Sequence, residues 1–226
     1  METSVPSREV RIRAGDAWLC GDLCLPRDFS GVVLFAHGSG SGRHSGRNRR
    51  VAQHLQRAGV ATLLFDLLTA DEEQRDVHTR EHRFDIPLLT GRMQDATAWV
   101  QTRGELQGAR IGYFGASTGS AAALIAAARL GRRISAVVSR GGRPDLAGAV
   151  ALAEVKAPTL LIVGGADPGV AEMNEDAYSR LRCAKELVVV PGATHLFEEH
   201  GALDRVCEEA STWFSKHFAG VPAAAA

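Results

Sequence analysis

Residues 110–119 read Arg-Ile-Gly-Tyr-Phe-Gly-Ala-Ser-Thr-Gly, an apolar run that ends in a Gly-x-Ser-x-Gly motif. The apolar run predicts a buried strand, and the alanine-rich stretch at 120–130, which stops at Gly131, predicts a helix. A serine on so tight a strand-to-helix turn must adopt a strained backbone, and Gly115 and Gly119 remove side chains that would collide with neighbouring elements. The motif therefore predicts an exposed, nucleophilic hydroxyl at Ser117; the alternative is an N-capping serine.

The rest of the chain alternates short apolar runs with helical patterns. Residues 9–14 and 17–25 alternate apolar and polar positions around Gly15-Asp16, which is typical of an antiparallel hairpin. Buried parallel strands are expected at 32–36, 60–65, 110–114, 134–138, 159–163 and 187–190. Helical periodicity between them predicts an α/β fold: a mostly parallel central sheet, helices on both faces and an N-terminal antiparallel hairpin. Functional loops are then expected at the carboxyl ends of the strands.

Composition favours one domain over residues 1–226. Hydrophobic residues make up 45% of the chain, and 26 basic residues balance 26 acidic ones, so we expect no nucleic-acid or membrane partner. The N-terminus lacks a signal-peptide pattern and no stretch is long enough to span a membrane, which predicts a cytoplasmic protein. All four cysteines are interpreted as small buried hydrophobes, with Cys20 and Cys24 too far apart along a strand to bridge.

A base and an orienting acid follow the serine in chain order. Asp167 comes just after the strand expected at 159–163, and His195 follows the strand at 187–190. Serine, acid and histidine in this order match a triad in this architecture. Asp145 is the alternative acid, and Glu198 lies close to His195 in sequence but would have to fold back onto it. The other histidines lie in charged or helical surroundings or, like His37, begin a turn.

A glycine-rich loop follows the first parallel strand. It reads His37-Gly38-Ser39-Gly40-Ser41-Gly42, and its glycines let the backbone approach a ligand closely. The oxyanion hole is expected to combine the N–H of Thr118 with that of Ser39, with Gly40 as the less favoured donor. A nucleotide-binding loop is the rival interpretation, but the spacing fits neither phosphate-binding fingerprint. No Cys-x-x-Cys pattern is present, so we expect no metal or redox site.

Together these motifs resemble the α/β-hydrolase superfamily, in particular its small lidless members similar to dienelactone hydrolases. The resemblance spans about residues 30–218. It implies a cofactor-independent carboxylesterase or lactone-opening enzyme, in which a nucleophilic serine is acylated and then released by water. Dienelactone hydrolases themselves carry cysteine where Ser117 stands, so their particular substrate is not transferred. Acyl transfer to an alcohol or perhydrolysis would use the same triad, and a non-catalytic binding protein is the alternative outside enzymes.

Four further features bear on the substrate, the surface and the end of the chain. Only a short connection follows the strand at 134–138, so we expect no large cap and a preference for short or compact esters. Arg43, Arg140 and Arg143 lie near strand ends, where one of them could bind a substrate carboxylate; the alternative is that they brace loops. Residues 66–85 are long and charged, and a solvated connection is favoured over a partial flap. The tail at 220–226 is interpreted as a frayed end. The oligomeric state is left open.

Overall fold

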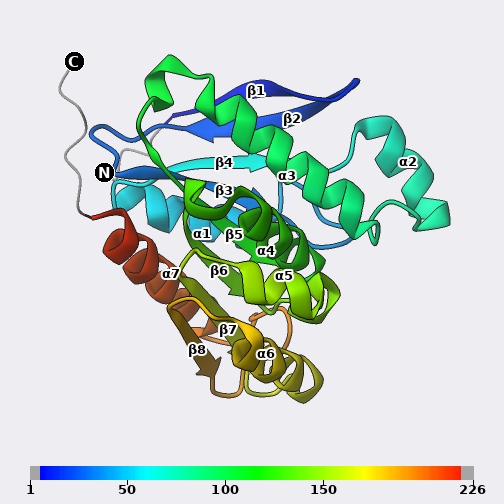
Figure 1. The fold of residues 1–226 in the computed structure, drawn as a ribbon, viewed down its shortest axis with the longest axis vertical. Coiled ribbons are helices and arrows are strands. Elements are labelled where there is room, and N and C mark those ends of the chain that lie inside the picture. Colours follow the sequence, from blue (N-terminus) through cyan, green and yellow to red (C-terminus); the bar gives the residue numbers. More distant parts are fainter. Residues whose placement is uncertain (1–5, 220–226) are drawn as a thin grey trace.

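The structure is a computed structural model that describes residues 6–219; the tail at 220–226 lies outside the described residues. An eight-stranded sheet runs through the molecule in the order β1-β2-β4-β3-β5-β6-β7-β8 (Figure 1). The strands are β1 Ser7–Ala14, β2 Ala17–Cys24, β3 Gly31–Ala36, β4 Ala61–Phe65, β5 Arg110–Ala116, β6 Ile134–Arg140, β7 Thr159–Gly164 and β8 Lys185–Val190. Strands β3 to β8 are parallel, and the β1–β2 hairpin joins β4 in antiparallel fashion. The expected strands and hairpin are confirmed.

Local chemistry explains the two kinds of strand. In the hairpin Ala14 pairs with Ala17, and Gly15 takes a φ of +60° that suits a two-residue turn. Strand β1 is exposed at most alternate positions because only one of its faces meets the core. Every residue of β3 and β7 is buried instead, as expected for parallel strands covered on both faces.

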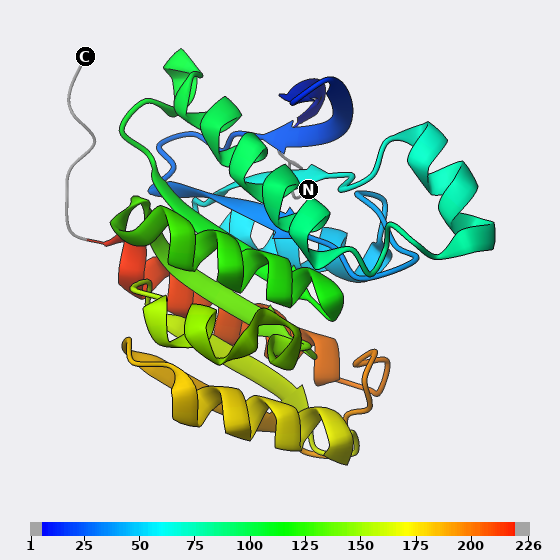
Figure 2. The same ribbon diagram turned by 45° about the vertical axis from the view of Figure 1, so that its right-hand side comes forward.

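Helices cover both faces of the sheet (Figure 2). On one face lie α1 Gly46–Arg57 and α7 Ala202–Phe218; on the other lie α3 Ile86–Gln101, α4 Thr118–Leu130, α5 Gly148–Glu154 and α6 Pro168–Arg180. The core is accordingly split into two apolar layers, with Leu55 and Phe214 in one and Met93 and Leu124 in the other. Helix α4 ends at Gly131, whose φ is +58°, as the sequence predicts.

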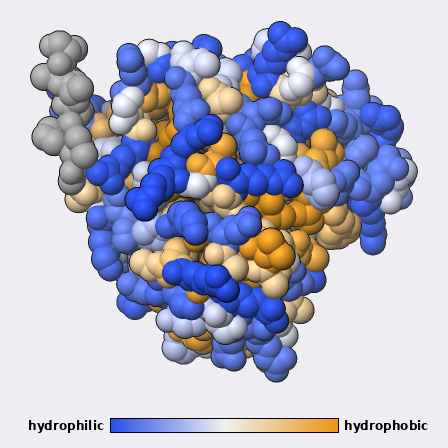
Figure 3. All heavy atoms as spheres, in the orientation of Figure 1, coloured by the Kyte–Doolittle hydropathy of each residue, from blue (hydrophilic) through white to orange (hydrophobic). Residues whose placement is uncertain are grey.

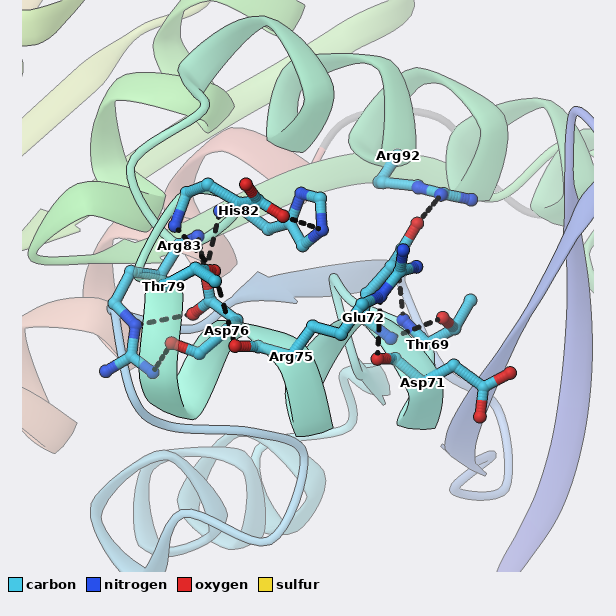
Figure 4. A network of polar contacts seen from close by, with 10 residues as sticks. Thr69, Asp71, Glu72, Arg75, Asp76, Thr79, His82, Arg83 and Arg92 are labelled. Atoms are coloured by element: carbon cyan, nitrogen blue, oxygen red, sulfur yellow. Dashed lines mark hydrogen bonds and ion pairs between the residues drawn. The ribbon is translucent and has the colours of Figure 1, made fainter.

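The charged segment at 66–85 is largely exposed between residues 70 and 85, as expected for a solvated connection, but it also contains a helix that the sequence did not predict. This helix is α2, Ala70–Thr79, which begins with a capping box in which Thr69 and Glu72 exchange side-chain-to-backbone hydrogen bonds. Figure 4 shows the contacts that hold it. The Asp76 side chain is completely buried and accepts hydrogen bonds from the backbone N–H of His82 and from the backbone and guanidinium of Arg83. The sequence pattern missed this because the burial of one carboxylate is a tertiary effect.

Burial opposes ionisation of Asp76, but the hydrogen bonds from Arg83 and His82 outweigh it and hold the pKa of the carboxyl below its ordinary value. A second ion pair, between Arg92 of α3 and Glu72, spans 2.8 Å and ties the start of α2 to the body of the protein. Leu67, Leu68 and Arg83 line a small cavity together with the loop at 37–41. Residues 66–85 therefore form a short, braced element beside that loop.

No helical insertion follows β6. The chain passes through a short 3₁₀ turn, Pro144–Ala147, directly into α5, so the described residues form no large cap at this position, as expected. Figure 3 shows a mostly hydrophilic face on which hydrophobic residues reach the surface near its middle, in the region of α4 and α5. Exposed Val150 and Leu146 belong to the α5 region.

The cysteine interpretation is correct for Cys24 and Cys207, which are buried, and wrong for Cys20, which is exposed; Cys183 is half-buried. Burial raises the pKa of Cys24 and of Cys207 to about 11, which disfavours their thiolates. Among residues 6–219, no helix combines the length and the apolar character needed to cross a membrane.

Two glycines decide how closely α4 approaches the sheet. A Cβ added at Gly119 would lie 2.3 Å from the carbonyl oxygen of Ala36 and 2.4 Å from that of His37. A Cβ at Gly115 would lie 2.5 Å from the Cα of Ser120. All of these contacts are with backbone, so no side-chain rearrangement can relieve them.

We expect Gly119→Ala to lower the free energy of unfolding by about 2–4 kcal/mol, because a methyl group there forces β3 and α4 apart. Gly91→Ala in α3 is the matched control, since nothing lies within 4 Å of the added Cβ. It should raise the free energy of unfolding by about 0.5–1 kcal/mol through helix propensity. Urea denaturation of the three proteins measures both values, and equal stability of the two variants would contradict the packing argument.

Candidate active site

Ser117 occupies the turn between β5 and α4. Its backbone has φ +49° and ψ −123°, a conformation that L-residues rarely adopt. Its carbonyl accepts the N–H of Arg143 at 3.0 Å, and its own N–H points to the carbonyl of Arg140 at 3.3 Å. The side chain makes no capping hydrogen bond to α4. The structure thus does not support the N-capping alternative, and it leaves the hydroxyl available for chemistry.

The acid and the histidine meet at the ends of β7 and β8. Asp167 Oδ2 accepts a hydrogen bond from His195 Nδ1 at 2.8 Å. Asp167 stands at the N-terminus of α6 but makes no side-chain capping bond there, so the carboxylate serves the imidazole. The hydrogen bond places the ring proton on Nδ1 and leaves Nε2 as an acceptor. Backbone bonds between the two loops, Ala166 N–H to Ala193 O at 2.9 Å among them, hold this pair in register.

Ser117 and His195 line one cavity of about 220 Å³, together with part of the glycine-rich loop. Their side chains form no hydrogen bond with each other in the described structure. The rival acids are occupied elsewhere: Asp145 forms a two-pronged pair with Arg143, and Glu198 pairs with Arg47 at 3.0 Å. Of the three candidate carboxylates, Asp167 is the one that contacts His195.

The two residues expected to supply the oxyanion donors are in contact with each other. The Ser39 N–H donates to Thr118 Oγ1 at 3.0 Å, which links the glycine-rich loop to the first residue of α4. The Thr118 N–H lies in the first turn of that helix, where backbone donors have no intrahelical partner. The Ser39 N–H can donate to an oxyanion only if it also does so to the Thr118 hydroxyl, in a shared hydrogen bond, or gives up its bond to that hydroxyl. Gly40, the other sequence candidate, has a φ of +67°.

His37 fixes the base of the same loop, a role that the sequence did not assign. Its Nε2 accepts the backbone N–H of Leu67 at 2.9 Å, and its Nδ1 donates to the carbonyl of Gly38 at 3.0 Å. Burial lowers the pKa of His37 despite the hydrogen bond to Gly38 and the nearby carboxylates of Asp66 and Glu73, which raise it. The neutral ring therefore joins the end of β3 to the segment after β4.

The three arginines named from the sequence have different surroundings. Arg43 forms ion pairs with Glu9, Asp22 and Asp66 at 2.9, 3.2 and 3.3 Å. Arg143 is held by Asp145, two residues along the chain. Neither lines the cavity of Ser117, and both contact acids as the loop-bracing alternative describes.

Arg140 differs from both. It lines the cavity with Ser117 and His195, is only 6% exposed, and lies with its guanidinium 5.7 Å from the centre of the Phe197 ring. Burial, with the neighbouring charge of Arg47, lowers the pKa of Arg140 to about 10. It therefore stays protonated at neutral pH. Arg47 also lines the cavity; the sequence did not single it out, because it is one of several arginines in and before α1.

A strained serine at a strand-to-helix turn, a histidine held by an acid at the ends of the next strands, and a doubly covered parallel sheet define an α/β hydrolase. Comparison with known families agrees: the dienelactone hydrolase family matches residues 24–217. The chain belongs to the dienelactone hydrolase family.

Solved structures place the fold firmly. A crystal structure of a dienelactone hydrolase from Anabaena variabilis is 54% identical, covers 95% of this chain and 99% of its own, and has a TM-score of 0.93. Est1E from Butyrivibrio proteoclasticus, with ferulic acid bound, is 16% identical over 93% of this chain and 100% of its own, with a TM-score of 0.81. At that identity the likeness concerns the fold alone.

A curated relative has a different kind of name. A Mycobacterium tuberculosis protein described as "Putative phosphoribosyl transferase" is 53% identical over 212 residues, which are 94% of this chain but 47% of the relative. The chain thus spans about half the length of that relative. The name describes the longer protein.

We expect the free energy of unfolding to fall as the pH drops from about 7 to about 5.5, a range above most carboxylate titrations. The pKa of His37 in the folded protein is below its ordinary 6.5, so the unfolded chain binds the proton first. His37→Gln, which keeps an acceptor for the Leu67 N–H, should flatten this dependence. His217→Gln is the control. Burial lowers the pKa of His217 as well, so the contribution of His217 to the pH dependence of stability must be measured separately. Denaturant unfolding at each pH measures the slopes; an unchanged slope in His37→Gln would contradict the assignment.

Proposed function

We propose that this protein is a serine hydrolase that cleaves carboxylic esters or lactones through an acyl-enzyme. The observation that carries the proposal is the 2.8 Å hydrogen bond between Asp167 and His195 at the cavity that Ser117 lines. An imidazole held in one tautomer, at the same cavity as a half-buried serine, is an arrangement suited to general-base activation of the serine hydroxyl.

In the proposed mechanism Ser117 Oγ attacks the substrate carbonyl while His195 Nε2 accepts its proton. Asp167 keeps the proton on Nδ1 and stabilises the imidazolium that forms. The N–H groups of Thr118 and Ser39 bind the oxyanion, helped by the positive end of the α4 dipole. His195 then returns the proton to the leaving alcohol, and a water molecule, activated in the same way, releases the acid from Ser117.

The cavity limits the substrate. Its volume is about 220 Å³, and no helical insertion after β6 adds an apolar wall for a long acyl chain. Short or compact esters are therefore the proposed substrates, without activation at lipid interfaces.

Other functions of the same fold remain distinct hypotheses. Acyl transfer and perhydrolysis use the same triad, and the exclusion of water from the cavity decides between them and hydrolysis. A non-catalytic binding protein would not react stoichiometrically with a serine-directed phosphonate, whereas the proposed hydrolase would. Phosphoribosyl transfer, named for a relative about twice as long, has no observation in this chain to favour it.

We expect Ser117→Ala and His195→Ala each to lower kcat/KM for 4-nitrophenyl esters by roughly 10³–10⁶-fold, and the double variant to lose little more than either alone. The reason is that nucleophile and base act as one unit. Initial rates on an acyl series from acetate to dodecanoate, with Ser117→Ala as the blank, measure both the losses and the chain-length limit. Losses that multiply in the double variant would count against a shared mechanism.

Asp167→Asn should lower kcat by about 10³–10⁴-fold while leaving the melting temperature nearly unchanged, because the amide keeps the shape but not the charge that orients His195. Asp145→Asn is the matched control: its carboxylate contacts Arg143 and not His195. It should keep nearly full activity. An inactive Asp145→Asn beside an active Asp167→Asn would transfer the role of the acid to Asp145.

A further inference from the structure

Arg140 is a buried charge without a counter-ion. Among residues 6–219 its guanidinium has no hydrogen-bond or ion-pair partner, its Nε is fully enclosed, and the Phe197 ring is the group it lies over. A buried cation costs several kcal/mol unless it is paired, and folded proteins rarely leave one so. At neutral pH the group is charged, since its pKa stays near 10. The missing counter-charge points to a ligand.

The position of Arg140 directs it into the active-site cavity. It ends β6 opposite Ala116 of β5, so it is next to the nucleophile's turn. Val138, two residues earlier and on the same face of the strand, packs in the apolar layer under α1 and α7. The Arg140 side chain therefore lies on the α1 side of the sheet, where it lines the cavity with Ser117.

The N-terminus of α1 faces the same cavity. Its N-cap Ser45 and the first-turn residues Arg47 and Asn48 line the cavity, and the first turn contains no acidic residue. The Ser45 hydroxyl already accepts the N–H of Asn48, while the first backbone donors of a helix have no intrahelical partner. The helix end adds a partial positive charge.

The local charges are not balanced. Arg47 is the second guanidinium, and its outward partner Glu198 is 64% exposed to solvent. Asp167, the other nearby carboxylate, is committed to His195. Two guanidiniums and a helix N-terminus thus line one cavity, and within residues 6–219 the carboxylate that pairs with either guanidinium is the exposed Glu198.

We propose that this corner of the cavity is a subsite for a phosphate group, and that the substrate is a carboxylic ester which also carries a phosphomonoester. The inference rests on the proposed function and deepens it. A carboxylate would be satisfied by one guanidinium fork, whereas a phosphomonoester carries a charge of about −1.5 to −2 and three acceptor oxygens. It can therefore engage Arg140, Arg47 and the α1 backbone together.

The phosphate group contributes to substrate binding and takes no part in the reaction. The bond that breaks is the carboxylic ester bond: Ser117 Oγ forms the acyl bond, the alcohol leaves with the proton from His195, and water completes the cycle. The phosphorus–oxygen bonds are unchanged. Binding energy from this remote group orients the ester carbonyl toward Ser117.

Equilibrium binding tests the subsite without any assay of activity. Inorganic phosphate, with acetate as the comparison anion at equal ionic strength, is titrated into wild type, Arg140→Met, Arg47→Gln and Arg50→Gln by calorimetry, with thermal melts alongside. Arg50 is the matched control: it lies on the same helix, is exposed and pairs with Asp204. Arg47→Gln, at a partly exposed position, guards against a folding defect in Arg140→Met.

We expect wild type and Arg50→Gln to bind phosphate at least tenfold more tightly than acetate, and to melt at a higher temperature in its presence. Arg140→Met and Arg47→Gln should each weaken phosphate binding at least tenfold. Equal phosphate affinity in wild type and both cavity variants overturns the proposal. Acetate that binds as tightly as phosphate overturns the choice of a phosphomonoester.

Kinetics then separate this inference from the proposed function. Matched 4-nitrophenyl esters with a neutral, a carboxylate-ended and a phosphonate-ended acyl chain are compared. The ratio of kcat/KM for the phosphonate ester to that for the neutral ester should fall at least tenfold in Arg140→Met and stay unchanged in Arg50→Gln. A protein that hydrolyses none of the esters contradicts the proposed function, and the binding result then decides on the subsite alone.

Discussion

The backbone of Ser117 stays in its left-handed conformation because β3, β5 and α4 approach one another more closely than any side chain would allow. At Gly119 the carbonyls of Ala36 and His37 leave no room for a Cβ, and at Gly115 the backbone of Ser120 leaves none. This close packing also brings the glycine-rich loop against the candidate nucleophile, since Gly38 lies close to the Ser117 side chain. Both halves of the candidate oxyanion hole depend on it. Strain at one residue is thus supported by packing spread over three elements.

The sequence predicted the features that depend on hydrophobic periodicity and on the glycines that end strands and helices. Buried strands, the Gly15 turn, the Gly131 helix end and the chain order of Ser117, Asp167 and His195 are all local signals, and the fold confirms the elements. It did not predict α2, because a run of charges describes a solvated connection and a capped helix equally well. What decides between them is the burial of Asp76 against Arg83, a tertiary contact between residues seven apart.

The arginines show, within the candidate site, that local sequence signals do not reveal tertiary contacts. Arg43, Arg140 and Arg143 all follow strand ends, and nothing local distinguishes them. The fold supplies acids to Arg43 and Arg143 and leaves Arg140 with an aromatic ring instead. Residue type and strand position therefore identified three candidate arginines. Only the hydrogen-bond and ion-pair partners seen in the structure distinguish an arginine that holds a loop in place from one that lacks a counter-ion. His37 and Arg47 were overlooked for the same reason, since their significance lies in what surrounds them.

The position of β8 at the edge of the sheet affects how the site responds to heat and denaturant. Asp167 and His195 follow β7 and β8, the last two strands of the sheet, and most residues of β8 are only partly buried, with Val189 about half exposed. Strands at the edge of a sheet have fewer packing neighbours, so their local unfolding costs less free energy than that of central strands. Detachment of β7 and β8 would separate Asp167 and His195 from Ser117, whose turn at the end of β5 lies further into the sheet and would still be intact. We therefore expect the proposed activity to be lost on heating or in denaturant before the protein unfolds globally.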